Sequence, residues 1–172
     1  GRIEYKKEQV SAKQLFSLLD HTIQNGLEEQ PVRYLSHFKG EDVNVVVDIE
    51  RITQVMDNLT SNIRKYANEG TVQFAIHTTK QSIEMSLRDE GQGIPEKDLP
   101  FIFDMHFSAS NNQNKDAHGI GLVICKQIIE HHGGKAKRTA DAIELPAPLL
   151  SGIRLIGRQI RQLYQSLRNC LF

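Results

Sequence analysis

The stretch NLTSNIRKY, residues 58–66, lies in the second half of a long helical pattern and decides the fold. Apolar side chains recur at steps of three and four over residues 49–68, which predicts an amphipathic helix. Asp48 is a good N-cap for this helix, and Gly70 ends it. Four polar side chains fall at steps of seven, four and three and so share one face beside the apolar stripe: Arg51, Asn58, Asn62 and Lys65.

This polar face has the chemistry of a metal and phosphate site. Two asparagines one turn apart are unfavourable in the middle of a helix. An amide oxygen is a hard, neutral ligand that suits Mg²⁺, which takes few protein ligands and keeps water and phosphate oxygens around it. Lys65, about one turn beyond Asn62, can reach a phosphate as a point charge. The alternative is that both asparagines are solvated or form only local hydrogen bonds.

A second motif, DEGQGI over residues 89–94, directly follows a strand pattern. Gly91 and Gly93 allow positive φ and a close backbone approach to a flat ligand. The carboxylate of Asp89 can accept a hydrogen bond from an exocyclic amino group such as that of adenine. An ordinary surface turn is the alternative, because Asp and Gly dominate turns.

A third motif, HGIGL over residues 118–122, opens a helix after a polar segment, residues 108–116, that is expected to be a mobile loop. Free N–H groups and the dipole at a helix start favour phosphate, although a lone Gly-x-Gly is a weak signal. Phe101, Phe103 and Phe107 are interpreted as packing residues that anchor the loop. Adjacent helical residues face different directions, so His131 and His132 are interpreted as surface residues or partners of the helix C-terminus rather than metal ligands.

The remaining pattern predicts an α+β two-layer sandwich with a mixed, mostly antiparallel sheet and helices on one face. The expected helices are residues 10–25, 49–68, 95–103 and 119–132, and the expected strands are residues 43–47, 71–79, 82–88 and 135–139. Strands 71–79 and 82–88 read as a hairpin, and Asn25-Gly26 reads as the stop of the first helix.

Composition restricts the class of protein. The chain has 172 residues, of which 39% are hydrophobic, enough for one domain with a sizeable core. No apolar run approaches the roughly 20 residues of a membrane span, and the charged N-terminus is not a secretory signal. Cys125 and Cys170 form no spacing motif and fit a reducing compartment. Residues 1–134 carry 14 basic and 19 acidic side chains, a net charge of −5, which argues against nucleic acid as a partner.

Taken together and in this order, the motifs resemble those of the ATP-binding catalytic domain of bacterial sensor histidine kinases, which has the Bergerat fold shared with DNA gyrase, MutL and the heat-shock chaperone ATPases. The resemblance covers about residues 1–134 and includes the N box (58–66), the G1 box (89–94), the F box (around 101–107) and the G2 box (119–122). It implies that residues 1–140 are this catalytic domain and that residues 108–118 form the ATP lid.

The resemblance also implies a role for each matched residue. Asn62 is similar to the family's Mg²⁺ ligand, Lys65 to its phosphate contact, and Asp89 to the residue that reads the adenine amino group. The other residues implied to line the ATP site are Asn58, Tyr66, Gly91, Gly93, Ile94, His118, Gly119, Ile120, Gly121 and Leu122. Asn58 stands where gyrase-like ATPases carry a glutamate that activates water, and an amide cannot act as a general base near neutral pH. ATP held without rapid hydrolysis is therefore expected, with Asn58, Asn62 and Lys65 as the catalytic set.

Three features depart from the family pattern. Ala117 replaces the glycine expected before the G2 box, and Met105-His106 replaces the commoner pair of the F box. The Gly-Thr turn expected after Gly134 is missing. Residues 141–172 instead read as a divergent basic tail. Its spacing fits an amphipathic helix that could replace the missing strand, bind a partner or touch a membrane surface, and the favoured alternative is an altered C-terminus that packs on the core or stays disordered.

The expected function is therefore a protein-histidine kinase domain of a two-component system, which binds Mg²⁺ and ATP and passes the γ-phosphoryl group to a histidine. None of the seven histidines lies in the family's acceptor motif, so the chain is expected to be an excised part whose acceptor lies on a separate dimerisation domain. The resemblance implies a membrane-anchored, homodimeric parent with this domain on its cytoplasmic side, and a response regulator as partner. The alternatives are a nucleotide-independent adaptor of the same fold, a serine-directed anti-sigma kinase, or a sister ATPase, which Asn58 disfavours.

Overall fold

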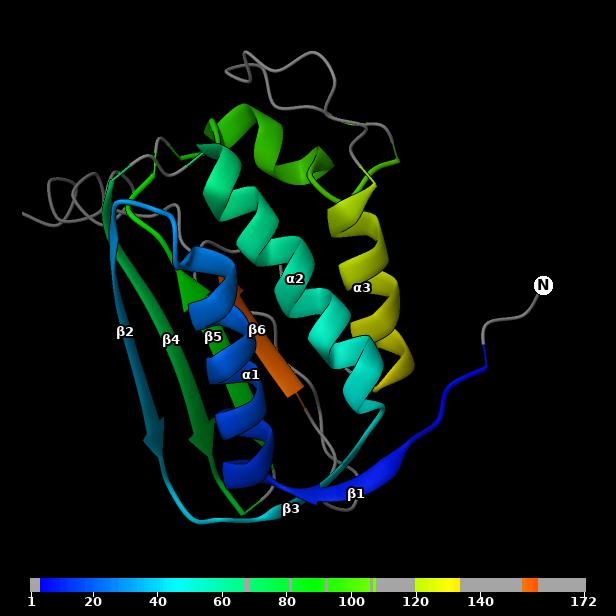
Figure 1. The fold of residues 1–172 in the computed structure, drawn as a ribbon. Coiled ribbons are helices and arrows are strands. Elements are labelled where there is room, and N and C mark those ends of the chain that lie inside the picture. Colours follow the sequence, from blue (N-terminus) through cyan, green and yellow to red (C-terminus); the bar gives the residue numbers. More distant parts are fainter. Residues whose placement is uncertain are drawn as a thin grey trace, which may run out of the picture.

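Three helices lie across one face of a four-stranded sheet in the computed structural model (Figure 1), which describes residues 4–66, 69–80, 82–91, 93–105, 107 and 120–133 and the backbone of residues 153–157. The strand order is β2-β4-β5-β6, with β2 at Val32–Lys39, β4 at Gly70–Thr78, β5 at Ile83–Arg88 and β6 at Ile153–Gly157. β4 and β5 pair antiparallel, whereas β2 pairs parallel with β4 and β6 parallel with β5. A separate antiparallel pair joins β1, Glu8–Ser11, to β3, Asn44–Val47. The α+β two-layer class is confirmed, with a mixed sheet and helices on one face.

The helices begin where the sequence supplies caps. α1, Ala12–Leu27, starts at a capping box in which Gln14 N–H donates to Ser11 Oγ at 3.1 Å and Ser11 N–H donates to Gln14 Oε1 at 3.2 Å. α2, Ile49–Tyr66, starts at Asp48, whose Oδ1 accepts the Arg51 N–H at 3.0 Å, so the predicted N-cap is confirmed. A 3₁₀ helix, η1, spans Glu96–Phe101, and α3 spans Gly121–His131. Within the described part of the chain, no helix combines the length and apolar character that a membrane crossing requires.

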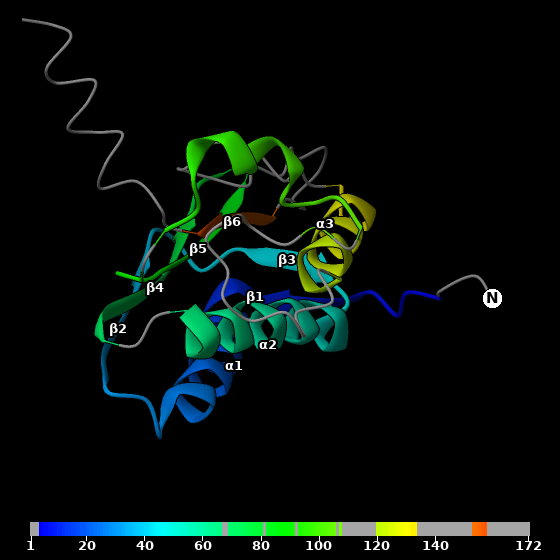
Figure 2. The same cartoon turned by 90° about the horizontal axis from the view of Figure 1, so that it is seen from above.

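The view from above shows the helices on one side of the sheet (Figure 2), and the buried residues of the core come from both layers. Each layer contributes one apolar face, because helical periodicity and strand alternation both direct large side chains inward. Fully buried members include Leu15, Leu19 and Ile23 of α1, Ile52 and Met56 of α2, and Phe74, Ile76 and Met85 of the sheet. Burying each such side chain contributes about 1.5–3 kcal/mol.

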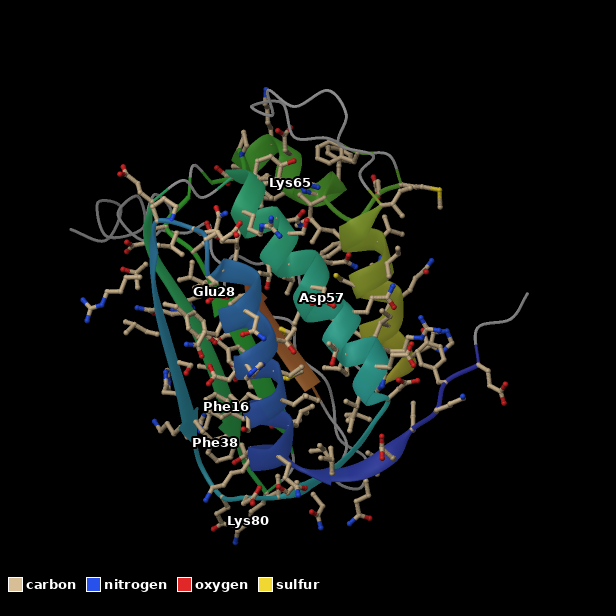
Figure 3. The ribbon with its side chains drawn as sticks, viewed as in Figure 1. Phe16, Glu28, Phe38, Asp57, Lys65 and Lys80 are labelled. Carbon is tan, nitrogen blue, oxygen red and sulfur yellow. The ribbon has the colours of Figure 1, made fainter. Side chains whose placement is uncertain are left out.

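Aromatic rings join α1 to the sheet near the start of that helix. Phe16 stacks on Phe74 with ring centroids 5.5 Å apart and meets Phe38 of β2 edge-on at 5.8 Å. Phe16 and Phe38 are adjacent in Figure 3. The cluster holds β2 beneath α1 and beside β4, where no strand was predicted from the sequence.

The contact between α1 and α2 depends on a glycine inside α1. The sequence predicted that the helix stops at Asn25-Gly26, but α1 continues to Leu27, so Gly26 lies inside the helix. A Cβ at Gly26 would lie 2.7 Å from Thr60 Cγ2, so the glycine allows the two helices to approach closely. The Thr60 hydroxyl in this contact is buried and makes no hydrogen bond within the described residues.

A buried histidine joins the far ends of α2 and α3. His132 Nε2 accepts the Asp48 N–H at 2.9 Å, and its Nδ1 lies 2.7 Å from the Ile128 carbonyl, so the neutral ring satisfies both partners. Tyr5 stacks on His131 at 4.4 Å and packs edge-on against His132 at 5.8 Å. His131 is exposed, as the first of the two predicted positions requires, whereas His132 is buried and contacts the Ile128 carbonyl in the last turn of α3, which is the other predicted role, a partner of the helix C-terminus. Packing of the N-terminal segment over the end of α3 is the physical reason for this burial.

The tail is the other correction. Residues 153–157 form β6 beside β5, so the helix expected there is wrong for these five residues. Aliphatic residues have strand propensity as well as helical spacing, and an adjacent strand with free backbone groups decides between the two. The expected loop 108–116, the expected strand 135–139, Ala117, Cys170 and residues 158–172 lie outside the described residues.

Candidate nucleotide-binding site

The N box and the start of α3 meet through one polar contact. Asn58 is half-buried on α2, and its Nδ2 donates to the Gly121 carbonyl at 3.5 Å. A Cβ at Gly121 would lie 3.9 Å from the Asn58 amide. Residues 63 positions apart in sequence are thus neighbours in space, which brings two of the predicted motifs together at one end of the helical layer.

The other N-box residues follow along α2 toward the same end. Asn62 and Tyr66 are half-buried, and Lys65 is exposed. Lys65 lies near the end of α2 (Figure 3). This gradient from half-buried amide to exposed ammonium suits a ligand that enters from solvent, because the lysine keeps its hydration until an anion replaces it.

The start of α3 has no side-chain cap at Ile120 among the described residues, in contrast to the capped starts of α1 and α2. The first N–H groups of a helix have no partner within the helix and carry the positive end of its dipole. Ile120 is exposed and Leu122 half-buried, while His118 and Gly119 lie outside the described residues. The described half of the G2 box therefore has the form of a phosphate-binding helix start.

The G1 turn follows β5 directly. The half-buried Asp89 accepts the Gly91 N–H at 2.8 Å with Oδ1, which fixes the orientation of the carboxylate. Gly93 has φ of +82°, a conformation that favours glycine. Gly91, Gly93 and Ile94 are half-buried, so the turn packs against the domain instead of projecting from it.

The F box lies between these elements. η1 follows β5 and precedes α3 along the chain, at the end of the domain where α2 ends (Figure 1), and the view from above shows it set apart from α2 (Figure 2). Phe103 is half-buried with Lys126 of α3 6.0 Å from its ring centroid, and Phe101 lies 6.0 Å from Phe107. Phe103 thus packs as predicted, whereas Phe101 is 49% exposed and Met105 65% exposed. The side chains of Phe101 and Met105 therefore point partly into solvent.

The buried thiol of Cys125 lies where α3 packs against α2. Cys125 Sγ lies 3.8 Å from the Val55 carbonyl. Burial raises the pKa of Cys125 to about 12, with a hydrogen bond from Asn58 acting in the opposite direction. The thiol is therefore a structural group here and not a nucleophile.

The donor set fits Mg²⁺ only together with a ligand. The described residues contain no group of three or more His, Cys, Asp or Glu side chains arranged to hold a metal ion. The amide oxygen of Asn62 could supply one hard ligand, and phosphate oxygens and water would supply the rest. Such a donor set could hold the cation only together with the phosphates of a ligand.

Sequence reasoning missed two residues of this region. It gave no role to Glu90, whose carboxylate accepts the Thr71 N–H at 3.0 Å, or to Asp98, which is buried in η1. The position of Glu90 inside the motif DEGQGI was the available signal, whereas nothing local distinguishes Asp98 from a solvated first-turn acid.

Comparison with known proteins identifies the class. Residues 47–148 match the family described as histidine kinase-, DNA gyrase B-, and HSP90-like ATPase. The chain is 34% identical over 122 residues to the sensor histidine kinase WalK of Bacillus subtilis, covering 68% of this chain and 20% of that protein. It is 35% identical over 111 residues to the adaptive-response sensory kinase SasA of Crocosphaera subtropica, covering 63% of this chain and 29% of that protein.

Two solved histidine kinase structures have a fold similar to that of this chain. The catalytic domain of histidine kinase ThkA superposes with a TM-score of 0.64 at 25% identity, covering 76% of this chain and 86% of that one. The mycobacterial sensor histidine kinase MprB has the same fold, with a TM-score of 0.63 at 19% identity, covering 84% of this chain and 92% of that one. The chain belongs to the histidine kinase-, DNA gyrase B-, and HSP90-like ATPase family. It spans less than a third of the length of the curated sensor kinases that it matches.

Proposed function

We propose that this chain is the ATP-binding catalytic domain of a sensor histidine kinase, which holds Mg²⁺ and ATP and donates the γ-phosphoryl group to a histidine on a separate dimerisation domain. The observation that carries the proposal is the contact between Asn58 and the Gly121 carbonyl, which places the amide face of α2 beside the uncapped start of α3. That arrangement offers an anion N–H donors on one side and an amide ligand with a nearby ammonium group on the other.

Different residues of the chain would bind the base, the metal ion and the phosphates of the nucleotide. Asp89 would accept a hydrogen bond from the adenine amino group, and its bond from the Gly91 N–H keeps the carboxylate oriented for this. Asn62 would hold Mg²⁺, which supplies charge neutralisation at the phosphates when bound. Lys65 and the first N–H groups of α3 would hold the phosphates on either side.

Asn58 favours transfer over hydrolysis. Its side chain donates to a backbone carbonyl and cannot take a proton from water near neutral pH. Positioning and charge stabilisation then remain as the means of catalysis, and they act only when an acceptor side chain is presented. The parent protein is proposed to be a membrane-anchored homodimer with this domain on the cytoplasmic side and a response regulator as the next phosphoryl acceptor.

The direct test is calorimetric titration of Mg²⁺ with ATP and with ADP into the chain, and into Asn62→Ala and Asp89→Ala. Micromolar-range binding by the parent chain that falls at least tenfold in both variants is expected, a loss of about 1.4 kcal/mol or more. Asp57→Ala is the matched control, because Asp57 is exposed on the same helix and points away from the sheet (Figure 3). No binding by the folded chain would refute the proposal and favour an adaptor role.

A second experiment separates the acceptors. Incubation with γ-labelled ATP should leave this chain unlabelled and should label an added dimerisation domain from a sensor kinase on histidine. Acid-stable label on serine of an added protein would favour the serine-directed alternative. Strong labelling of this chain alone would contradict the proposed division between donor and acceptor domains.

A further inference from the structure

Where β5 leaves the sheet, a side chain from the G1 turn accepts a hydrogen bond from the backbone of β4. The ladder between β4 and β5 ends at the pair Gln73 and Arg88. On the same antiparallel register, the second position beyond this pair places Thr71 opposite Glu90, because each step along one strand is matched by a step back along the other. There the Thr71 N–H donates to the Glu90 carboxylate, Oε2, at 3.0 Å.

The neighbouring glycine accommodates this carboxylate. Gly70 has φ of +102°, and a Cβ at this position would lie 2.9 Å from Glu90 Cβ and 3.1 Å from Oε2. Any side chain at Gly70 would therefore meet Glu90, in addition to the backbone strain. The start of β4 is shaped so that the acid of the G1 turn packs against it.

Glu90 and Thr71, the two partners of this hydrogen bond, are close in sequence to different parts of the candidate site. Glu90 is flanked by Asp89 and Gly91, whose own hydrogen bond of 2.8 Å orients the Asp89 carboxylate. Thr71 follows the connection that begins where α2 ends, at Tyr66. The bond between Glu90 and Thr71 thus ties the G1 turn to the segment that follows the N box.

We propose that Glu90 is a positioning residue for the base of the bound nucleotide, and this inference rests on the proposed function. Its carboxylate, bonded to the Thr71 N–H, sets where the backbone of residues 89–91 turns away from the sheet and so sets the spacing between the Asp89 carboxylate and the end of α2. A backbone ladder bond at this point would continue β5 and carry Asp89 along the strand direction. The side-chain bond ends the ladder and still satisfies the Thr71 donor.

The base of the nucleotide gives a readout that a purely structural role would not move. Inosine triphosphate carries a carbonyl where ATP has the exocyclic amino group, so it lacks the donor that Asp89 is proposed to accept. If Glu90 positions Asp89, its removal weakens binding of ATP and leaves binding of inosine triphosphate nearly unchanged. A general loss of folding or of phosphate binding would weaken both nucleotides equally.

The test measures the dissociation constants of ATP and inosine triphosphate, each with Mg²⁺, for the parent chain and for Glu90→Ala, Glu90→Asp and Glu90→Gln. Glu90→Ala and Glu90→Asp, whose side chains do not reach Thr71, are expected to lose five- to tenfold in ATP affinity with less than a twofold change for inosine triphosphate. Glu90→Gln keeps an acceptor oxygen at the same reach and should stay within threefold of the parent chain for both. Glu28→Gln, an exposed glutamate at the end of α1, is the control and should change neither (Figure 3).

The outcomes separate this inference from the proposed function. A parent chain that binds no ATP, or that does not prefer ATP to inosine triphosphate, would refute the role of Asp89 and with it the basis of the inference. A parent chain that prefers ATP, together with Glu90 variants that keep the same preference, would overturn the role of Glu90 alone. If Glu90→Ala does not fold, the comparison of Glu90→Asp with Glu90→Gln decides, because the two differ in reach.

Discussion

Replacing Gly121 by alanine should make the protein more stable and a weaker binder of ATP. The new Cβ would lie 3.9 Å from Cγ and Oδ1 of Asn58 and 4.0 Å from its Cβ, which are ordinary van der Waals distances. Three such contacts add about 0.3–0.6 kcal/mol at roughly 0.1–0.2 kcal/mol each. The lower entropy of the unfolded chain adds about 0.4–1 kcal/mol. The total of about 1 kcal/mol corresponds to a rise in melting temperature of roughly 2–4 °C for a chain of this size.

The same methyl group would lie at the start of α3, where phosphate is proposed to approach the backbone N–H groups. ATP affinity should therefore fall at least tenfold, or about 1.4 kcal/mol. Thermal unfolding and calorimetric titration of the same sample measure both effects. Ser17→Ala, at an exposed position inside α1, is the control and should change stability without changing affinity. A more stable Gly121→Ala protein with unchanged ATP affinity would refute the phosphate site, and a large drop in melting temperature would refute the geometry around Asn58.

Three further outcomes follow from buried contacts. Gly26→Ala should destabilise by up to about 2 kcal/mol in urea unfolding, because overpacking of about 1–3 kcal/mol against Thr60 outweighs a helix gain of up to about 1 kcal/mol. Adding Thr60→Ser should relieve the clash, and strictly additive effects in this double-mutant cycle would contradict it. Burial lowers the pKa of His132 below its ordinary value of 6.5. Below pH 6.5 the unfolded state therefore binds more protons than the folded state. The free energy of unfolding should fall as the pH drops from 6.5 toward the folded-state pKa, by no more than about 1.4 kcal/mol per pH unit. Lys7 and His131 lower the pKa of His132 further, whereas the Ile128 carbonyl and Asp48 raise it. If the stability of a His132→Gln variant shows the same pH dependence between about pH 5 and 7.5, this explanation is excluded. Burial raises the pKa of Cys125 to about 12, so in a Cys170→Ser background this thiol should react with thiol reagents at about pH 8 only after unfolding. Rapid labelling of Cys125 in the native protein would show that the contact between α2 and α3 opens.

Local signals predicted most elements correctly. α2 and its cap at Asp48 follow from a 3.6-residue period and one good N-cap residue, both of which act within a few residues of sequence. β4 and β5 follow from alternation around a short turn. β2 was missed although Val32, Tyr34 and Phe38 alternate inward, because polar residues and an exposed Leu35 interrupt the pattern. Its stability comes from pairing with β4 and from packing of Phe38 against Phe16, both of which are contacts with distant residues.

The candidate site shows the same division. The sequence determined which chemical groups are available, the amides of Asn58 and Asn62, the carboxylate of Asp89 and the glycine at position 121, because residue type and local period suffice for that. Only the tertiary structure decided that Asn58 lies against Gly121, that His132 is buried and neutral, and that Glu90 replaces a ladder bond at Thr71. These contacts join residues that are 19 to 84 positions apart. They depend on strand register, helix crossing and loss of solvent, which arise only when the whole domain packs.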